Sequence, residues 1–598
     1  MTLILLLLAA IALGRQLVPD AWRLVAAETW LFRLLTGMAV AALVVLLLGS
    51  ASLTAAQVAL AGIAAVGLVR WRARGGVDHA DVAEPAPLAP FEKVSLAAIA
   101  GAFVLTLIGA LAPVTSWDAA VAHLALPSDY ARAGRIYLHP GNVYSGYPHL
   151  MHCLFASVYH HGGALPTTVL SWLFGVAACA AVYLLGRRIE SRRVGLTAAA
   201  LLATAPIFMD QAGTVSIDLA FTAFATAALA AVVAWFDEKR LRWLVLAGLL
   251  AGSACGVRHT GYVVCVLLAV GVLAGRSPRR IRAVACFSTA ALVAALPWLA
   301  RSALLSGNPV FPLLSGWFPS SAIEHIAVGG AHESLSRSGG SSLVGFLRFP
   351  WDIIMRPGRF DGWTKSPGGM VLILGLPGLL LGSWRVRNTG LYGVAGCALF
   401  YFFQRFARYM LPFFTPLMVV AAAAVERTGK LRKGVLAVLA ATYLFGLALH
   451  GAAIHFKVPV VLGLQSRAAY LTSRVERYPA FAYVNEHLGD GTVLTIDQRS
   501  YYINGPSYQN HWALKRIAGL PLKEQVAWLR EQGIRYILLP LDFVEASGAI
   551  REDVGAMVDV WRRTPGVFEA VCAPMDIPSP KGGLDRVEIY RVKDAKAP

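Results

Sequence analysis

The chain alternates long apolar runs with short polar stretches over about its first three quarters. A helix that crosses a bilayer needs roughly 20 predominantly apolar residues. The runs predict about fourteen membrane-spanning helices, over residues 2–14, 32–49, 51–69, 94–113, 166–186, 194–209, 218–236, 243–257, 259–275, 283–303, 369–383, 389–404, 409–425 and 434–456. This pattern is typical of an all-α polytopic membrane protein.

Beyond residue 456 the pattern changes to amphipathic helical stretches that are each followed by a β-branched run. Examples are "AFAYVNEHLGD" before "GTVLTID", "PLKEQVAWLREQG" before "IRYILLPL", and the final "VEIYRV". They predict a small α/β domain. The predicted organisation is N-terminal transmembrane helices (1–74), a Pro- and Ala-rich cytoplasmic linker (75–93), a transmembrane body (94–456) and the α/β domain (457–598).

The net charge of +19 would suggest nucleic acid in a soluble protein, but the mean hydropathy is +0.60 and only 15% of residues are charged. Most basic residues form short clusters between apolar runs, which is the positive-inside pattern of membrane proteins. We therefore expect membrane lipids and no nucleic acid as partners. The six clusters are Arg70, Arg72 and Arg74; Arg187, Arg188, Arg192 and Arg193; Lys239, Arg240 and Arg242; Arg276, Arg279, Arg280 and Arg282; Arg385 and Arg387; and Arg427, Lys430, Arg432 and Lys433.

With these clusters in the cytoplasm, alternation of the spans places four pieces on the outer side. They are the loops 114–165 and 304–368, the short turn 405–408 and the chain beyond 458. The N-terminus is expected outside as well. Neither the seven scattered cysteines nor the histidines of the first outer loop have the spacing of a metal site. We therefore expect no cofactor, with a divalent metal as an alternative that the sequence leaves open but does not indicate.

Asp118 lies in the first outer loop, directly after the fourth span. A carboxylate at a membrane boundary is well placed to act as a general base. Asp118 or Ser116 is equally well placed to cap the helix expected over 119–126, and the residues leave both interpretations open. His123 would lie about 140° around an α-helix from Asp118, which argues against a joint role. Asp129, Tyr130 and Arg132 are expected on the wet side of an interfacial helix.

Four arginines at outer ends of spans run against the positive-inside trend: Arg258, Arg301, Arg405 and Arg408. A single arginine of this kind commonly extends to lipid headgroups. Four in corresponding places favour an anion site, because a phosphate at the membrane boundary is held strongly by such groups.

Several motifs in order, "WDAAVAHLALPSDYARAGRI", "YPHLMH", "APIFMDQAGTVSIDLAFTAF", "PWLARSALLSGNPVFP" and "RFARYMLPFFTPL", resemble bacterial membrane glycosyltransferases of the GT-C fold. Relatives of that kind include the lipid A aminoarabinose transferases and the protein O-mannosyltransferases of glycosyltransferase family 39. The resemblance covers roughly residues 96–425. It implies a sugar donor on a polyprenyl phosphate and an inverting transfer to a lipid, glycan or protein acceptor.

The resemblance also implies roles for individual residues. Asp118 matches the base that deprotonates the acceptor. Arg408 and Tyr409 match the Arg-Tyr pair that holds the donor phosphate, with Arg405, Arg258 and Arg301 as further candidates. His123, Tyr147, His149 and Asn308 are assigned to substrate binding, and Asp218 matches an acidic residue at a helix start. Three departures from the family pattern are Ala119 in place of a second acid, which weighs against a divalent metal, Arg258 in place of Lys, and His152 in place of Glu.

Together these observations predict a glycosyltransferase in the bacterial cytoplasmic (inner) membrane, with its active site on the periplasmic face. The alternatives are an enzyme like the O-antigen ligases or polymerases, and a transporter or flippase of lipid-linked substrates. In the C-terminal domain, "DQRSYYINGPSYQNHW" has aromatic groups, among them Tyr501, Tyr502 and Trp512, that suit either carbohydrate stacking or simple packing.

Overall fold

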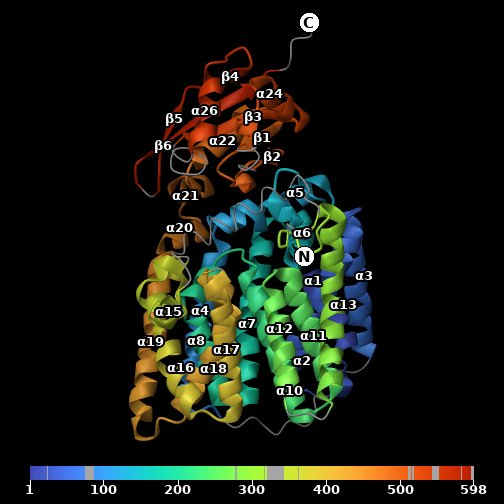
Figure 1. The fold of residues 1–598 in the computed structure, drawn as a ribbon, viewed down its shortest axis with the longest axis vertical. Coiled ribbons are helices and arrows are strands. Elements are labelled where there is room, and N and C mark those ends of the chain that lie inside the picture. Colours follow the sequence, from blue (N-terminus) through green and yellow to red (C-terminus); the bar gives the residue numbers. More distant parts are fainter. Residues whose placement is uncertain are drawn as a thin grey trace.

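The computed structural model describes residues 1–598 except 23, 74–86, 276–278, 315–316, 319–341, 361, 404, 510–513, 515–516, 542–550, 581 and 594–598. The helices stand side by side in one bundle, and a sheet-containing unit with the C-terminus lies beyond one end of it (Figure 1). Much of the predicted linker, part of the loop 304–368, Arg74, Arg276 and Trp512 lie outside the described residues.

Three N-terminal helices, α1 (Thr2–Leu17), α2 (Ala26–Gly49) and α3 (Leu53–Ala73), pack on one another. Glycines allow the close approach of α1 and α2. A methyl group on Gly14 would collide with the Arg33 carbonyl oxygen, and one on Gly37 would collide with the Ala10 carbonyl oxygen. The two backbones can therefore touch only because these positions lack side chains.

The body of the bundle follows after the linker, and α4 begins at Pro90, earlier than the predicted span. Its helices are α4 (Pro90–Leu111), α7 (Ala164–Ile189), α8 (Arg192–Ala203), α9 (Pro206–Ala212), α10 (Asp218–Glu238), α11 (Leu241–Val257), α12 (Gly261–Ala274), α13 (Arg280–Ser306), α15 (Leu343–Met355), α16 (Gly369–Leu381), α17 (Trp384–Phe403), α18 (Leu411–Val425) and α19 (Arg432–Ile454). Each predicted span overlaps one of the helices, except 194–209, which overlaps both α8 and α9.

Among the described residues, eight helices are long and apolar enough to cross a membrane, and α8 with α9 would make a ninth. Four shorter apolar helices, 2–17, 241–257, 261–274 and 369–381, accompany them. The chain is therefore a multi-span membrane protein, and the number of about fourteen spans stays a prediction.

The predicted span 194–209 is bent by 68° between α8 and α9. Pro206 is the first residue of α9 and Ala205 before it has extended backbone angles, φ −69° and ψ 134°. Proline disfavours a helical conformation in the residue before it and donates no backbone hydrogen bond. The bend therefore has a local cause in the sequence.

Two of the basic clusters lie at one end of the bundle, where Arg427 after α18 pairs at 2.9 Å with Glu190 between α7 and α8. Arg188 at the end of α7 donates two hydrogen bonds, of 2.8 and 2.7 Å, to Glu28 at the start of α2. Arg192 at the start of α8 pairs at 2.9 Å with Glu92 in the first turn of α4. Asp118 follows the other end of α4, so these clusters and Asp118 lie at opposite ends of the bundle, as predicted.

The first outer loop folds into a π-helical turn, η2 (Ala119–His123), and the helices α5 (Ala125–Ala133) and α6 (Leu150–Gly162). The prediction that Asp129 and Tyr130 face water is wrong, because their exposed fractions are 5% and 0%. Asp129 is buried because it pairs with Arg132 and lies 3.5 Å from His139. The Tyr130 hydroxyl is 2.8 Å from Nε2 of His149.

The C-terminal unit contains one six-stranded sheet with path β2-β1-β3-β6-β4 and β5 paired with β6. Strands β2, β1 and β3 are parallel, and β6 is antiparallel to its neighbours. Each helix and strand predicted from the sequence is present. The elements are α20 (Val458–Val461), α21 (Arg467–Arg474), α22 (Tyr478–His487), β1 (Thr492–Thr495), β2 (Ser507–Tyr508), α24 (Leu522–Glu531), β3 (Ile534–Pro540), α26 (Arg551–Arg562), β4 (Phe568–Ala570), β5 (Met575–Pro578) and β6 (Leu584–Val592).

Candidate active site

Asp118 stands at the start of the π-helical turn, in the N-cap position. Its carboxylate makes no capping hydrogen bond, and Ser116 Oγ instead lies 2.7 Å from the Thr214 hydroxyl. The Asp118 carboxylate pairs with Arg408, which comes 290 residues later in the chain. The sequence left open whether Asp118 is a base or a helix cap, and the structure shows no capping by its side chain.

The π-helical turn brings His123 towards Asp118. Leu124 N donates to the Ala119 carbonyl at 2.8 Å, an i→i+5 bond. With this spacing, residue i+5 returns to the side of residue i, whereas an α-helix would turn it away. The α-helical geometry expected for this segment is therefore wrong, while the absence of a joint role of Asp118 and His123 stays a prediction. His123 Nδ1 also lies 3.1 Å from His152 Nε2.

Arg408 and Tyr409 lie in the short helix η6 (Ala407–Met410), which leads into α18. The Tyr409 ring lies near two guanidinium groups, with Arg258 at 3.6 Å and Arg408 at 5.4 Å from its centroid. Arg258 follows α11 and pairs with Asp218, the first residue of α10. Asp118, Arg408, Tyr409, Arg258 and Asp218 thus form one connected polar cluster.

The charges of this cluster act on Asp118. Burial raises the pKa of the Asp118 carboxyl, but the neighbouring Arg408 and His123 outweigh it and hold the pKa below its ordinary value. The Asp118 side chain is still 38% exposed, whereas that of Arg408 is 15% exposed. Asp118 is therefore an ionised carboxylate that a small molecule can reach.

Burial lowers the pKa of His123 to about 4, and the positive charges of Arg258 and Arg408 act in the same direction against the attraction of Asp118. His123 is thus neutral near pH 7. Burial also raises the pKa of the Tyr144 hydroxyl, and the negative charge of Asp118 raises it further. Tyr144 is a neighbour that sequence reasoning missed, because it is one of several tyrosines in the loop and no motif singles it out.

Three further predicted residues, Arg301, Tyr147 and His149, make contacts that hold the first outer loop in place. Arg301 on α13 donates to the carbonyl oxygens of Ser145 at 2.8 Å and Tyr147 at 3.3 Å. The Tyr147 ring lies edge to face with His259, at a centroid distance of 5.3 Å. His149 is fully buried beside Tyr130. Arg301 and Tyr147 thus connect α13 and the α11–α12 turn to the loop that carries Asp118, whereas His149 joins α5 to α6 within that loop.

Asn308 and Arg405 have local partners. Asn308 holds the turn after α13, because its Nδ2 donates to the Leu313 carbonyl at 2.8 Å and its Oδ1 accepts from Val310 N at 2.9 Å. Arg405 donates to the Tyr401 carbonyl at 3.1 Å and lies 4.3 Å above the Tyr401 ring. Their roles in substrate and phosphate binding stay predictions.

Lys365, in the second outer loop, was missed by the sequence analysis. It pairs with Asp210 on α9, and Thr364 Oγ1 donates to the same carboxylate at 3.0 Å. Its charge contributes to the lowered pKa of Asp118. Several other basic residues lie in this loop, so nothing in the sequence distinguishes Lys365 from them. The described residues contain no group of three or more His, Cys, Asp or Glu side chains arranged to hold a metal ion.

Residues 148–300 match the family described as dolichyl-phosphate-mannose-protein mannosyltransferase. Among solved structures, ArnT from Cupriavidus metallidurans bound to undecaprenyl phosphate is similar, with 13% identity and a TM-score of 0.55 over 84% of this chain and 99% of that chain. The arabinofuranosyltransferase AftD from Mycobacteria has 17% identity and a TM-score of 0.51 over 86% of this chain and 40% of that chain. No curated protein sequence matches the chain.

The bundle and these similarities define the class: the chain is a polytopic membrane protein with the GT-C fold. The mannosyltransferase match covers residues 148–300, which lie within this fold.

Proposed function

We propose that this protein transfers a sugar from a polyprenyl-phosphate carrier to a hydroxyl acceptor on the outer side of the bacterial inner membrane, with inversion. The acceptor is a lipid, glycan or protein of the cell envelope. One observation carries the proposal: a reachable carboxylate, Asp118, is paired with Arg408 next to Tyr409 and Arg258. A base and cations for a phosphate are thus present in one site.

The cluster suits a phosphate that leaves as the sugar is transferred. Arg408 and Arg258 are engaged here by Asp118 and Asp218, two carboxylates. A donor phosphate can replace a carboxylate as the partner of a guanidinium, because both offer oxygens in a geometry that Arg binds well. The most direct exchange is at Arg408, since its present partner Asp118 is the more exposed of the two carboxylates.

This exchange would couple donor binding to activation of the base. A carboxylate held by an arginine has a lowered pKa and is a weak base. When the donor phosphate takes Arg408, the Asp118 pKa rises and its oxygen becomes free for the acceptor hydroxyl. The acceptor oxygen then bonds to the anomeric carbon of the sugar and the bond between that carbon and the phosphate oxygen breaks. The hydroxyl proton passes to Asp118, and Arg408 with Arg258 neutralises the departing phosphate.

The comparisons support the donor class. The similar ArnT structure is bound to undecaprenyl phosphate, and the family matched by residues 148–300 uses a dolichyl-phosphate sugar by its description. The basic clusters at the end opposite Asp118 support an outer site under the positive-inside rule. Direct displacement by the acceptor gives inversion and needs no nucleophilic carboxylate. The proposal requires no metal.

The test is sugar transfer by purified protein with native lipid and acceptor pools. The donors are radiolabelled hexose, pentose and amino-sugar derivatives of polyprenyl phosphate. We expect transfer from at least one donor by the wild type, and its loss in Asp118→Asn and in Arg408→Ala.

Matched controls are Glu190→Gln and Arg427→Ala, which break an ion pair of 2.9 Å among the basic clusters. These two variants should retain transfer. If the folded wild type transferred none of the sugars, the proposal would be wrong, and a ligase-like enzyme or a lipid-linked substrate transporter would take its place.

A further inference from the structure

Two backbone carbonyl groups on either side of Asp118 are held by side chains from the C-terminal domain. Tyr502 Oη donates to the Val114 carbonyl at 2.8 Å, and Gln509 Nε2 donates to the Val121 carbonyl at 2.8 Å. Tyr502 and Gln509 are only 6% and 4% exposed. Both hydrogen bonds are therefore shielded from competing water, and they tie down both ends of the segment 114–121 that contains Asp118.

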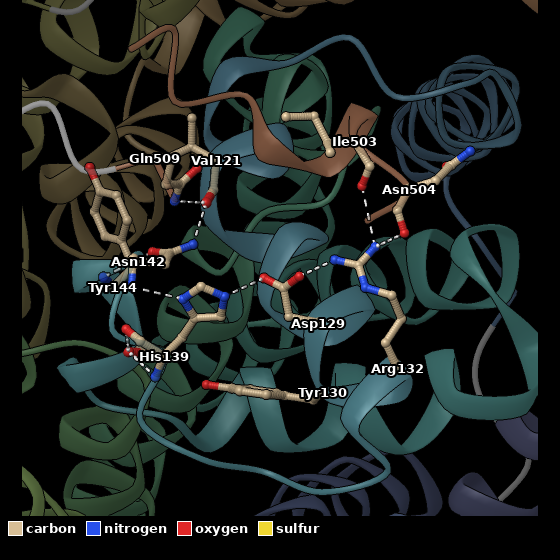
Figure 2. Close-up of polar contacts among 12 residues, drawn as sticks. Val121, Asp129, Tyr130, Arg132, His139, Asn142, Tyr144, Ile503, Asn504 and Gln509 are labelled. Atoms are coloured by element: carbon tan, nitrogen blue, oxygen red, sulfur yellow. Dashed lines mark hydrogen bonds and ion pairs between the residues drawn. The ribbon is translucent and has the colours of Figure 1, made fainter. Parts of the chain in front are cut away.

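A second part of the first loop joins the same contact. The Val121 carbonyl also accepts from Asn142 Nδ2 at 2.9 Å (Figure 2). Gln509 N donates to the Gly141 carbonyl at 3.0 Å. The approach is close, since a Cβ on Gly141 would lie 2.8 Å from Tyr508 Cα. Gln509 thus contacts the π-helical turn and the 139–142 segment at once.

A third contact lies on α5, just after the π-helical turn. Arg132 Nη1 donates to the carbonyl oxygens of Asn504 at 2.9 Å and Ile503 at 3.2 Å (Figure 2). Asp129 orients Arg132 by an ion pair and is itself 3.5 Å from His139. The segment 502–509 therefore contacts the loop before, within and after the turn that follows Asp118.

Apolar packing reinforces these hydrogen bonds. Ala120, the second residue of the π-helical turn, is fully buried in a cluster otherwise built from the C-terminal domain, including Tyr470, Phe481 and Tyr502. The backbone two residues from Asp118 is thus part of the core of that domain. The burial of Tyr502 also favours packing over carbohydrate stacking for this residue.

We propose that the segment 502–509 of the C-terminal domain positions Asp118 for catalysis, with Tyr502 and Gln509 as the positioning residues. The inference rests on the proposed function and adds a role for this domain in the chemical step. Asp118 has a short side chain, so the place of its carboxylate is set mainly by its backbone. A misplacement of about 1 Å in a catalytic group can lower a rate by about 100-fold.

The test compares Tyr502→Phe, Gln509→Leu and the double variant in the transfer assay. Matched controls are Tyr590→Phe and Gln525→Leu, which remove hydrogen bonds of 2.7 and 2.8 Å inside the same domain. We expect kcat to fall about tenfold in each single variant, with an unchanged KM for the donor, while both controls keep the wild-type rate.

The pH profile separates positioning from a simple loss of folded enzyme. A displaced Asp118 would be held less closely by Arg408, His123 and Lys365, so its pKa would rise and the acid limb of kcat/KM would move to higher pH. A smaller folded fraction lowers the rate at every pH without moving this limb.

Wild-type kcat and an unmoved acid limb in the folded double variant would overturn the inference. If the double variant does not fold, Tyr502→Phe decides by the same two measurements, since it removes a single oxygen atom. If the wild type transfers sugar and the variants have the same kcat and pH profile, only this inference is wrong. If the wild type transfers no sugar, the proposed function is wrong.

Discussion

The guanidinium of Arg258 lies 3.6 Å from the centroid of the Tyr409 ring and at the same time pairs with Asp218 at the start of α10. One arginine thus connects the turn after α11, the start of α10 and the Arg-Tyr pair before α18. A planar guanidinium can do both, because its face stacks on the ring while its edge binds a carboxylate.

Replacement of Tyr409 should weaken donor binding through the lost ring. A cation–π contact contributes about 0.5–2 kcal/mol, so Tyr409→Leu should raise the donor KM by about 2- to 30-fold. Tyr409→Phe keeps the ring and should stay close to wild type. Phe456→Leu, which removes the ring 3.9 Å beneath Arg474 in the C-terminal region, is the matched control. Equal KM values for the Leu and Phe variants of Tyr409 would contradict this role.

Arg258 and Asp218 should show strong coupling in a double-mutant cycle. The Asp218 side chain is 4% exposed, and loss of the partner of a buried charge commonly costs about 3–5 kcal/mol. Arg258→Ala should therefore lower Tm in detergent more than Arg258→Ala combined with Asp218→Asn. Additive changes in Tm would show that the pair is not coupled.

The lowered pKa of Asp118 makes the Asp118–Arg408 pair a stabilising contact at neutral pH. A carboxyl whose folded pKa lies below its unfolded value, ordinarily about 3.9, stabilises the fold above that value. This stability is lost as the pH falls through the folded pKa. Arg408→Gln should remove this dependence below about pH 4, as thermal unfolding at a series of pH values would show. An unchanged pH dependence in Arg408→Gln would mean that the pair contributes no stability.

His123 should have the same sign of pH effect as Asp118, but at higher pH. Its pKa is lowered from 6.5 to about 4 in the fold, so the unfolded chain binds the additional proton first. The fold should lose on the order of 3 kcal/mol from this group as the pH falls from about 6.5 to about 4. His123→Gln should flatten the change of Tm over this interval.

The groups that face His123 are Asp118, Arg258, Arg408 and His152. His161→Gln serves as a control, because His161 lies at the exposed end of α6. A Tm that depends on pH equally in wild type and His123→Gln would contradict a buried, neutral His123.

The sequence allowed the helices and the C-terminal alternation of helix and strand to be predicted, because both follow from local periodicity. It also placed Asp118 and Arg408 in one site through the order of motifs, although they are 290 residues apart. The π-helical turn was not predictable, because "AAVAH" reads as ordinary helix and its geometry depends on outside partners of Val121 and Ala120.

The same reason explains the error at Asp129 and the omission of Lys365. A charged residue on a short amphipathic helix is normally exposed, and only the fold reveals that His139 and Arg132 meet Asp129. Likewise, Lys365 reaches Asp210 only because the bend at Pro206 turns α9 away from the axis of α8. Such contacts join segments far apart in the chain and leave no local signature.

The hydrogen bonds from Tyr502 and Gln509 to the Asp118 segment each span 388 residues of sequence. During synthesis, the segment 114–121 therefore emerges long before the groups that hold it. A nascent chain that already contains every predicted membrane helix still lacks both bonds, and they form only after residue 509 has been made and has packed on the segment 114–121. The Asp118 segment thus stays untethered on this side until the chain has been synthesised to at least residue 509.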